Sequence, residues 1–187
     1  VYVDDFKLAG PEKDMKKAWK ELAEHIDMDD PTAIGKYLGC EHKVGIIRHN
    51  GTQVRTCDYI MKGFAEQCVA VYLDFTGETR NCLWKVSTPF IEVDPEEEVM
   101  DSGHLQAIAS SVLMKVLYMA HVARFELLKP VTYQASRITK WSRACDRKLH
   151  RLMCYIDSTK DHILQGYIGD TDKELRLDLD SDADFAG

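Results

Sequence analysis

The sequence predicts a mixed α+β fold, and three observations predict it. The chain has 187 residues, of which 45% are hydrophobic and 29% are charged, so it is long enough to bury a core. Apolar residues recur at helical spacing in several long segments. Short β-branched and aromatic segments, bounded by turn-forming residues, lie before and after these segments. Because no apolar run reaches the roughly 18–20 residues of a membrane span, we expect no contact with a membrane.

Residues 1–103 are predicted to form two hairpins, two helices and a linker. Adjacent aspartates favour a turn, and so does Asn-Gly. Proline opens helices, and glycine commonly ends them. The predicted elements, in order, are a hairpin of residues 1–3 and 6–8 around Asp4-Asp5, a helix from Pro11 to about His25, strands at 36–47 and 53–57 around Asn50-Gly51, a helix at 58–75 closed by Gly77, and an acidic connection from Glu78 to Gly103.

The remainder is predicted to form a helical block and a second hairpin. Residues 104–160 divide into helices at 104–123, 128–141 and 143–159, the last with Ser142 as its N-cap. In residues 161–187, the strands 163–168 and 175–179 are expected to pair across Gly169-Asp170. The boundaries of the three predicted units are therefore 1–103, 104–160 and 161–187.

Charge is distributed unevenly along the chain. The net charge is −7, which by itself argues against indiscriminate binding to nucleic acid. Residues 104–160, however, hold ten basic and three acidic residues, a net charge of +7. Arginines spaced four residues apart lie on one face of a helix, where they can contact phosphates. The residues of this predicted basic face are Lys140, Arg143, Arg147 and Arg151, with Lys148 and His150 beside them. A solvated face of a core helix is the alternative interpretation.

Two groups of carboxylates could hold a hard cation. Asp4 and Asp5 are adjacent at a predicted hairpin tip, and Mg²⁺ prefers carboxylate oxygens. Residues 178–184 have an aspartate at every second position, alternating with Leu179, Ser181 and Ala183, which places the aspartates, Asp182 among them, on one face of a strand. A solvated turn and a solvated strand face are the alternatives.

Six sequence blocks are distributed over nearly the whole chain. They are Tyr2-Val3-Asp4-Asp5, Tyr37-Leu38-Gly39-Cys40-Glu41, Val86-Ser87-Thr88-Pro89, residues 112–118 with Ala123-Arg124-Phe125-Glu126-Leu127, residues 149–159, and Ser181-Asp182-Ala183-Asp184-Phe185-Ala186-Gly187. In content and order these blocks resemble the copia-type retrotransposon polyprotein, in its reverse transcriptase and the start of its ribonuclease H. Phe125-Glu126 and Phe185 depart from the family's Pro-Asp and Trp.

The resemblance implies an RNA-directed DNA polymerase that works through two Mg²⁺ ions. Asp4 and Asp5 would be polymerase metal ligands, and Asp182 the first ribonuclease H carboxylate. Tyr2 belongs to the signature, while Tyr37, Leu38 and Gly39 would hold the primer end. The fold would be the end of a polymerase palm with its thumb, a helical connection block, and a hairpin opening a ribonuclease H-like domain.

The implied partners are an RNA template with its DNA primer, deoxynucleoside triphosphates and the rest of the polyprotein. In the family, the polymerase site needs a further aspartate before Val1, and the ribonuclease H site needs further acidic residues after Gly187. We therefore expect a piece of a longer protein with no polymerase activity by itself. Six cysteines without a C-x-x-C pair suggest a reducing compartment, and the resemblance implies a cytoplasmic particle and the nucleus. A non-catalytic nucleic-acid-binding or scaffold module and a decayed, inactive copy are the alternatives.

Overall fold

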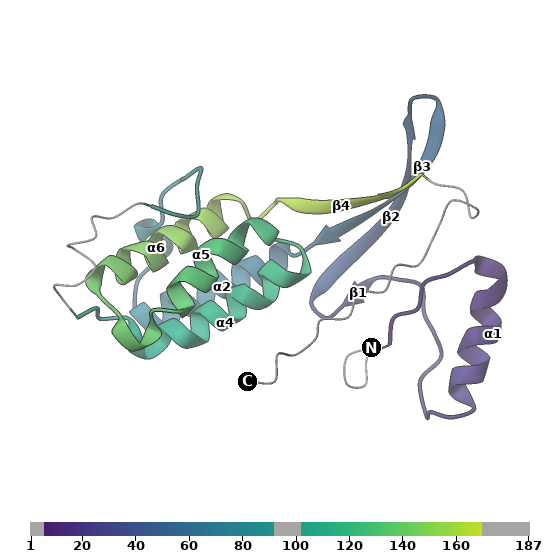
Figure 1. The fold of residues 1–187 in the computed structure, drawn as a ribbon, viewed down its shortest axis with the longest axis horizontal. Coiled ribbons are helices and arrows are strands. Elements are labelled where there is room, and N and C mark those ends of the chain that lie inside the picture. Colours follow the sequence, from purple (N-terminus) through teal and green to yellow (C-terminus); the bar gives the residue numbers. More distant parts are fainter. Residues whose placement is uncertain (1–5, 92–101, 170–187) are drawn as a thin grey trace, which may run out of the picture.

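A computed structural model describes residues 6–91 and 102–169 and has a mixed α+β fold, as the sequence predicts (Figure 1). Four of its helices form a bundle, and its strands form one sheet beside it. The elements are α1 (Glu12–Ala23), β1 (Lys36–Tyr37), β2 (Cys40–His49), β3 (Thr52–Ile60), α2 (Lys62–Thr76), α4 (Gln106–Val122), α5 (Leu128–Ala135), α6 (Arg143–Ser158) and β4 (Ile163–Ile168), with short 3-10 turns at Arg80–Cys82, Phe125–Leu127 and Ile138–Lys140.

The sheet is antiparallel, with the strand order β1-β2-β3-β4. Strands β2 and β3 are joined at Asn50 and Gly51, whose φ angles of 49° and 81° are those of the tight turn that Asn-Gly predicts. Strand β3 continues to Ile60, although the sequence predicted a helix from residue 58. That prediction was wrong because residues 58–60 pair with β2 on one side and β4 on the other.

Strand β4 joins the N-terminal sheet. Ile163 pairs with Ile60, and Ile168 pairs with Arg55. The sequence predicted residues 175–179 as the partner of this strand, but that segment lies outside the described residues. The ladder between β3 and β4 therefore links residues that are more than 100 positions apart, which no local pattern in the sequence indicates.

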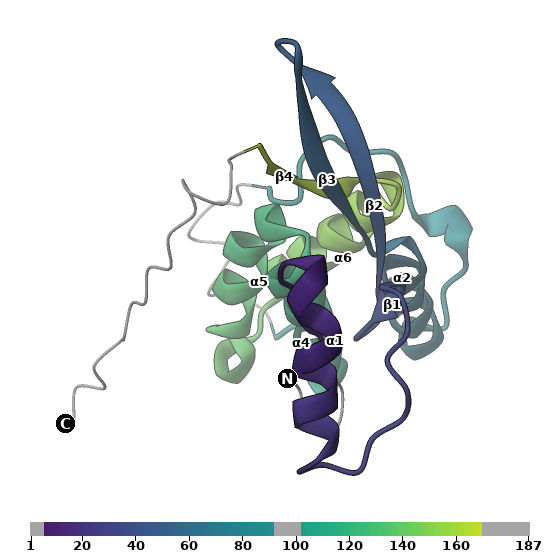
Figure 2. The same cartoon turned by 90° about the vertical axis from the view of Figure 1, so that its right-hand side faces the viewer.

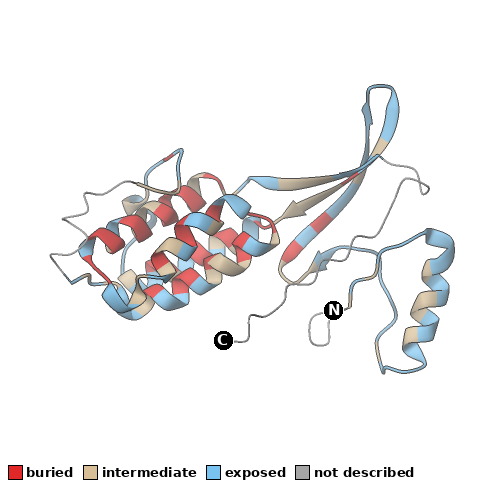
Figure 3. Cartoon of the chain, viewed as in Figure 1, coloured by how far each residue is buried: buried red, intermediate tan, exposed pale blue. Residues whose placement is uncertain are grey.

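One hydrophobic core fills the helical bundle, as the burial colours of Figure 3 show. Leu113 and Leu149 are completely buried there, from α4 and α6 respectively. Val69 and Tyr72 of α2 belong to the same core. The core therefore joins residues from both sides of the boundary predicted at Gly103.

The three helices of residues 104–160 were predicted with different success. Those at 104–123 and 143–159 are confirmed as α4 and α6, and the Ser142 hydroxyl accepts a hydrogen bond from the Cys145 amide as its N-cap. The helix predicted at 128–141 is too long, since α5 ends at Ala135. The chain continues through the 3-10 turn Ile138–Lys140 to Trp141, which is buried and donates its indole N–H to Asp146 at 2.6 Å.

The N-terminal part contacts the bundle little. The second strand of the predicted N-terminal hairpin, residues 6–8, is not formed. The first strand, residues 1–3, lies outside the described residues. Helix α1 follows Pro11, as predicted, but none of its residues is buried. Figure 1 shows α1 on the far side of the sheet from the bundle, and Figure 2 views the molecule from the side on which α1 lies.

Candidate nucleic-acid interface

The carboxylates predicted to hold Mg²⁺ are not among the residues that the structure describes. Asp4, Asp5 and Asp182 lie outside residues 6–91 and 102–169, as does Tyr2. Within those two ranges no group of three or more His, Cys, Asp or Glu side chains could hold a metal ion. The candidate site is therefore built from the predicted primer-holding residues and the predicted basic face.

The turn between β1 and β2 carries the predicted primer-holding residues. Leu38 and Gly39 have φ angles of 49° and 78°, so the chain reverses within two residues. The Tyr118 hydroxyl donates a hydrogen bond to the Leu38 carbonyl oxygen at 2.6 Å. A Cβ atom on Gly39 would lie 3.3 Å from the Phe64 ring, so a side chain at this position would crowd that ring. Two helices of the bundle thus fix the turn.

A cleft of about 780 Å³ opens beside this turn. Leu38 and Gly39 line it together with Phe64 and Tyr118. Lys36 and Lys62 also line the cleft, and so does Glu41, whose carboxylate pairs with Lys43 at 3.3 Å. The arrangement combines a fixed backbone edge, two aromatic rings and two cations, which suits an anionic ligand that presents a flat face.

His42 connects the N-terminal residues to the same turn. Its Nδ1 atom lies 3.1 Å from the Cys40 carbonyl oxygen and 3.2 Å from that of Gly35. A carbonyl oxygen can only accept, so Nδ1 carries the proton and Nε2 accepts from the Lys7 ammonium at 3.0 Å. Lys7 also lies over the Tyr37 ring, 5.8 Å from its centroid. The sequence pattern gave no sign of the contact between Lys7 and His42, because the two residues are 35 positions apart.

The predicted basic face of α6 is smaller than the sequence suggested. Arg143 and Arg147 are exposed one helical turn apart, and Lys140 is exposed just before the helix. Arg151 is half-buried and donates to the Thr88 carbonyl oxygen at 3.0 Å and to its hydroxyl at 2.9 Å. Both acceptors are neutral, so these bonds leave the guanidinium charge uncompensated.

Two residues predicted beside this face serve the interior instead. Lys148 is only 3% exposed, and its ammonium donates to the Tyr133 hydroxyl at 3.0 Å and lies over the Phe90 ring. His150 bonds the Tyr72 hydroxyl at 2.9 Å and the Cys82 carbonyl oxygen at 3.1 Å. Helical spacing alone could not show this, because the aromatic partners come from other parts of the chain.

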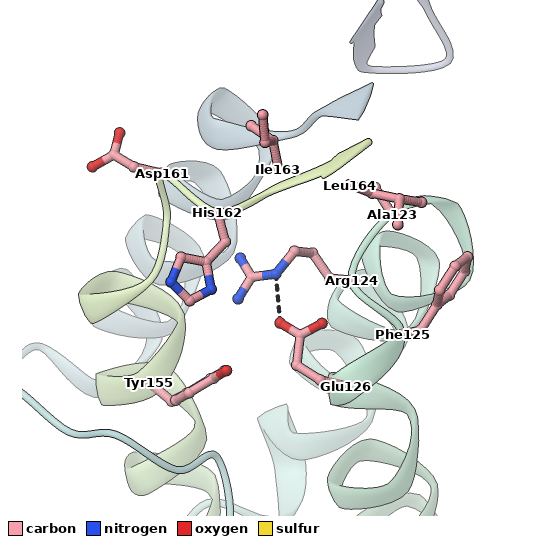
Figure 4. Close-up of a pocket in the computed structure, with 9 residues that line it drawn as sticks. All are labelled: Ala123, Arg124, Phe125, Glu126, Tyr155, Asp161, His162, Ile163 and Leu164. Atoms are coloured by element: carbon pink, nitrogen blue, oxygen red, sulfur yellow. Dashed lines mark hydrogen bonds and ion pairs between the residues drawn. The ribbon is translucent and has the colours of Figure 1, made fainter. Parts of the chain in front are cut away.

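Arg124 is a buried cation to which the sequence pattern gave no role. It is 3% exposed and donates to both the carbonyl and the hydroxyl oxygen of Thr159, at 3.1 and 2.7 Å. Its Nε atom pairs with Glu126 at 2.6 Å, as Figure 4 shows. A cavity of about 480 Å³ borders these residues, with His162 on its rim. The bonds fasten the end of α6 to the end of α4.

Three buried cysteines have raised thiol pKa values. Among the described residues all six are free. Burial raises the pKa of Cys68 to about 12 and also raises the pKa of Cys40 and Cys154. These three thiols therefore stay protonated near neutral pH and act as small apolar groups.

Comparison of the chain with protein families, curated proteins and solved structures found no match. No described helix combines the length and apolar character needed to cross a membrane.

Proposed function

We propose that the chain is part of the reverse transcriptase of a copia-type retrotransposon and holds an RNA–DNA hybrid, with the primer end at the β1–β2 turn. One observation carries the proposal. Tyr118 belongs to one block of the resemblance and Leu38 to another, and the two residues, 80 positions apart, share a hydrogen bond of 2.6 Å. The residues that resemble the family thus meet at the turn that would hold the primer.

Other blocks of the resemblance meet in the same way. Arg124 and Thr159 come from different blocks and are joined by two hydrogen bonds. Thr88 and Arg151 come from two blocks and are also joined by two. A chance match of short motifs would not require their residues to contact one another, so these pairs support a common origin with the family.

The roles of the individual residues follow from this proposal. Asp4 and Asp5 would hold Mg²⁺, which supplies a charge that activates the primer hydroxyl and neutralises the triphosphate. Asp182 would begin the ribonuclease H site. Lys7, two residues after Asp5, lies over the Tyr37 ring. This contact supports the proposal that the segment with Asp4 and Asp5 and the β1–β2 turn belong to one site.

A basic surface would hold the backbone of the hybrid. Lys140, Arg143 and Arg147 are exposed and can approach phosphates, which fix a duplex in place without reading its sequence. This surface needs no metal ion. It therefore also favours a second candidate function, a non-catalytic nucleic-acid-binding module.

The first experiment measures binding of a fluorescent RNA–DNA hybrid by fluorescence anisotropy at about 50 to 200 mM salt. Affinity that comes from phosphate contacts falls steeply over this range of salt concentration. We expect salt-dependent binding, and the triple variant Lys140→Gln, Arg143→Gln, Arg147→Gln should reduce the slope of log K against log salt by about 0.7–0.9 for each phosphate that is no longer neutralised. The matched control changes Lys13, Lys16 and Lys20 of α1 to Gln. An equal reduction in the control, or no salt-dependent binding, would refute the basic surface.

The second experiment separates the two candidate functions. Hybrid and nucleotide binding are measured with and without Mg²⁺ for the unchanged chain, for Asp4→Asn and for the control Asp14→Asn on α1. The reverse transcriptase proposal expects a Mg²⁺-dependent component that Asp4→Asn removes and Asp14→Asn keeps. Binding that ignores both Mg²⁺ and Asp4→Asn would favour the non-catalytic module.

A further inference from the structure

Trp84 forms part of a second cleft, separate from the β1–β2 turn. The cleft has a volume of about 500 Å³ and lies between the segment after α2 and the outer face of α6. Trp84 is 55% exposed, whereas Trp141 is 4% exposed. A cleft of this size is within the range of small-ligand sites, and its lining is largely apolar.

His150 holds the indole of Trp84 in place. The two ring centroids are 4.8 Å apart, with 46° between the planes. The His150 Nε2 atom faces the Cys82 carbonyl oxygen at 3.1 Å and must donate to it, so in the neutral ring Nδ1 accepts from the Tyr72 hydroxyl. Both nitrogens of the supporting ring are therefore occupied, and the imidazole is fixed. The indole is packed on one side while much of its surface stays open.

Positive charge lies beside this indole. Arg147 and Arg151 of α6 line the cleft, one helical turn apart, and His104 lines it as well. The Thr88 oxygens hold the Arg151 guanidinium without neutralising its charge. A flat aromatic surface beside two cations matches a base attached to phosphates.

Two carboxylates also line the cleft. Asp146 accepts hydrogen bonds from the amides of His104 and Leu105 at 2.7 and 3.0 Å and from the indole of Trp141 at 2.6 Å. Its charge thus stabilises the start of α4. Glu78 is exposed at the cleft and opposes an anion there. Removal of this charge, as in Glu78→Gln, should therefore strengthen the binding of an anion in the cleft.

We propose that this cleft binds an unpaired nucleotide of a single-stranded nucleic acid, with its base stacked on Trp84 and its flanking phosphates at Arg147 and Arg151. The identity of the polymer rests on the proposed function. Bases inside a duplex already stack on each other, so Trp84 adds a preference for single strands that the exposed basic surface cannot provide.

The test uses the 187-residue chain and fluorescent 12-mers of thymidylate and of uridylate, with the RNA–DNA hybrid in parallel. Trp84→Ala should weaken 12-mer binding roughly 5- to 100-fold, the loss expected when one stacking aromatic is removed, and leave hybrid binding within about twofold. Trp84→Phe keeps a stacking ring and should lose much less. Phe125→Ala removes an aromatic that is 53% exposed elsewhere and should change nothing.

The charged residues give two further readouts. Arg147→Gln should lower the salt dependence of 12-mer binding, and Glu78→Gln should raise the affinity. Equal weakening of 12-mer and hybrid by Trp84→Ala, no weakening at all, or binding of thymidine monophosphate as tight as that of the 12-mer would overturn the inference. If the 12-mer binds through Trp84 while the hybrid does not bind, the inference stands and the proposed function fails.

Discussion

The helical bundle and the sheet use their apolar residues in opposite ways. Helices α2, α4, α5 and α6 enclose the buried core. In the sheet, Val44, Ile46 and Tyr167 are each more than 60% exposed. The bundle and the hairpin of β2 and β3 meet at one end only, where Cys40 is 1% exposed (Figure 3). We therefore expect the bundle to supply most of the stability of the chain and the sheet to depend on its attachment to the bundle.

The length of the hairpin explains this difference. Strands β2 and β3 have ten and nine residues, and residues 46–53, which form the far end of their hairpin, are all exposed. In Figure 1 this end projects beyond the bundle. A hairpin without cover is marginally stable by itself. Its near end is held by the hydrogen bond from Tyr118 to Leu38 and by the ladder between β3 and β4. We call this near end, where the sheet meets the bundle, the junction, and we expect it to determine the position of the sheet.

The largest effect is expected in the bundle. Leu113→Ala removes a completely buried side chain and should lower the free energy of unfolding by about 3–5 kcal/mol. Ile46→Ala removes a residue that is 66% exposed and should cost less than about 1 kcal/mol. Urea unfolding of both variants measures this directly. Equal costs would mean that the sheet contributes as much stability as the bundle.

Arg124 gives the next largest effect. Arg124→Met removes the donors to Thr159 and should cost about 2–4 kcal/mol, because the bonds are charged and buried. The matched control is Arg80→Met, which breaks the ion pair between Arg80 and Asp157. This pair is 2.6 Å long, as is the pair between Arg124 and Glu126. Arg80 is half exposed, so about 0–1 kcal/mol is expected. A control as costly as Arg124→Met would contradict this ranking.

The junction itself can be tested at Gly39. Gly39→Ala places a side chain at a left-handed φ and against the Phe64 ring, so the cost should be about 2 kcal/mol. At Gly51 the φ angle is similar, but nothing lies within 4 Å, and Gly51→Ala should cost about 1 kcal/mol. Calorimetry on the two variants separates backbone strain from steric crowding. We expect the greater destabilisation at Gly39.

One position within the bundle should gain stability. The Gln134 amide is completely buried, and neither its nitrogen nor its oxygen has a hydrogen-bond partner among the described residues. Gln134→Leu replaces it with an apolar side chain of similar volume and should raise the free energy of unfolding by about 1 kcal/mol. Thermal unfolding would show a higher midpoint. A lower midpoint would mean that the amide is satisfied in the folded chain.

The smallest effect is an acid dependence at the junction. The Lys62 ammonium bonds Asp161 at 2.7 Å, which lowers the pKa of Asp161 below its ordinary 3.8. The folded pKa is depressed, so the stabilisation is present above pH 3.8 and is lost as the pH falls through the lowered pKa. Both side chains are well exposed, so the effect is small. The difference in midpoint between Asp161→Asn and the unchanged chain should shrink toward zero in acid. A constant difference would exclude the ion pair as its cause.

The sequence predicted the local elements better than the long-range ones. Helical spacing identified α4 and α6, and Asn50-Gly51 identified the hairpin turn. The end of β3 was missed because Asp58–Ile60 continue into an apolar helical pattern, although these residues extend the hairpin with β2 and also pair with β4, more than 100 residues away. Local periodicity contains no information about such a partner.

The candidate site divides in the same way. Spacing correctly put Arg143 and Arg147 on an exposed part of α6. It could not show that His150 turns toward Tyr72, 78 residues away, or that Lys148 turns toward Phe90. The sequence also gave no indication of the proposed stacking role of Trp84, because that role depends on the contact of its indole with the His150 ring. The predicted ligands Asp4, Asp5 and Asp182 stay predictions.

Cross-linking of the primer end tests the central claim most directly. A DNA primer with 4-thiothymidine at its 3′ terminus is annealed to an RNA template, bound to the chain and irradiated, and the linked peptides are identified by mass spectrometry. We expect cross-links at the turn and its cleft, at Tyr37, Leu38, Phe64 or Tyr118. Cross-links confined to α6 or α1, with the hybrid still bound, would contradict the placement of the primer end.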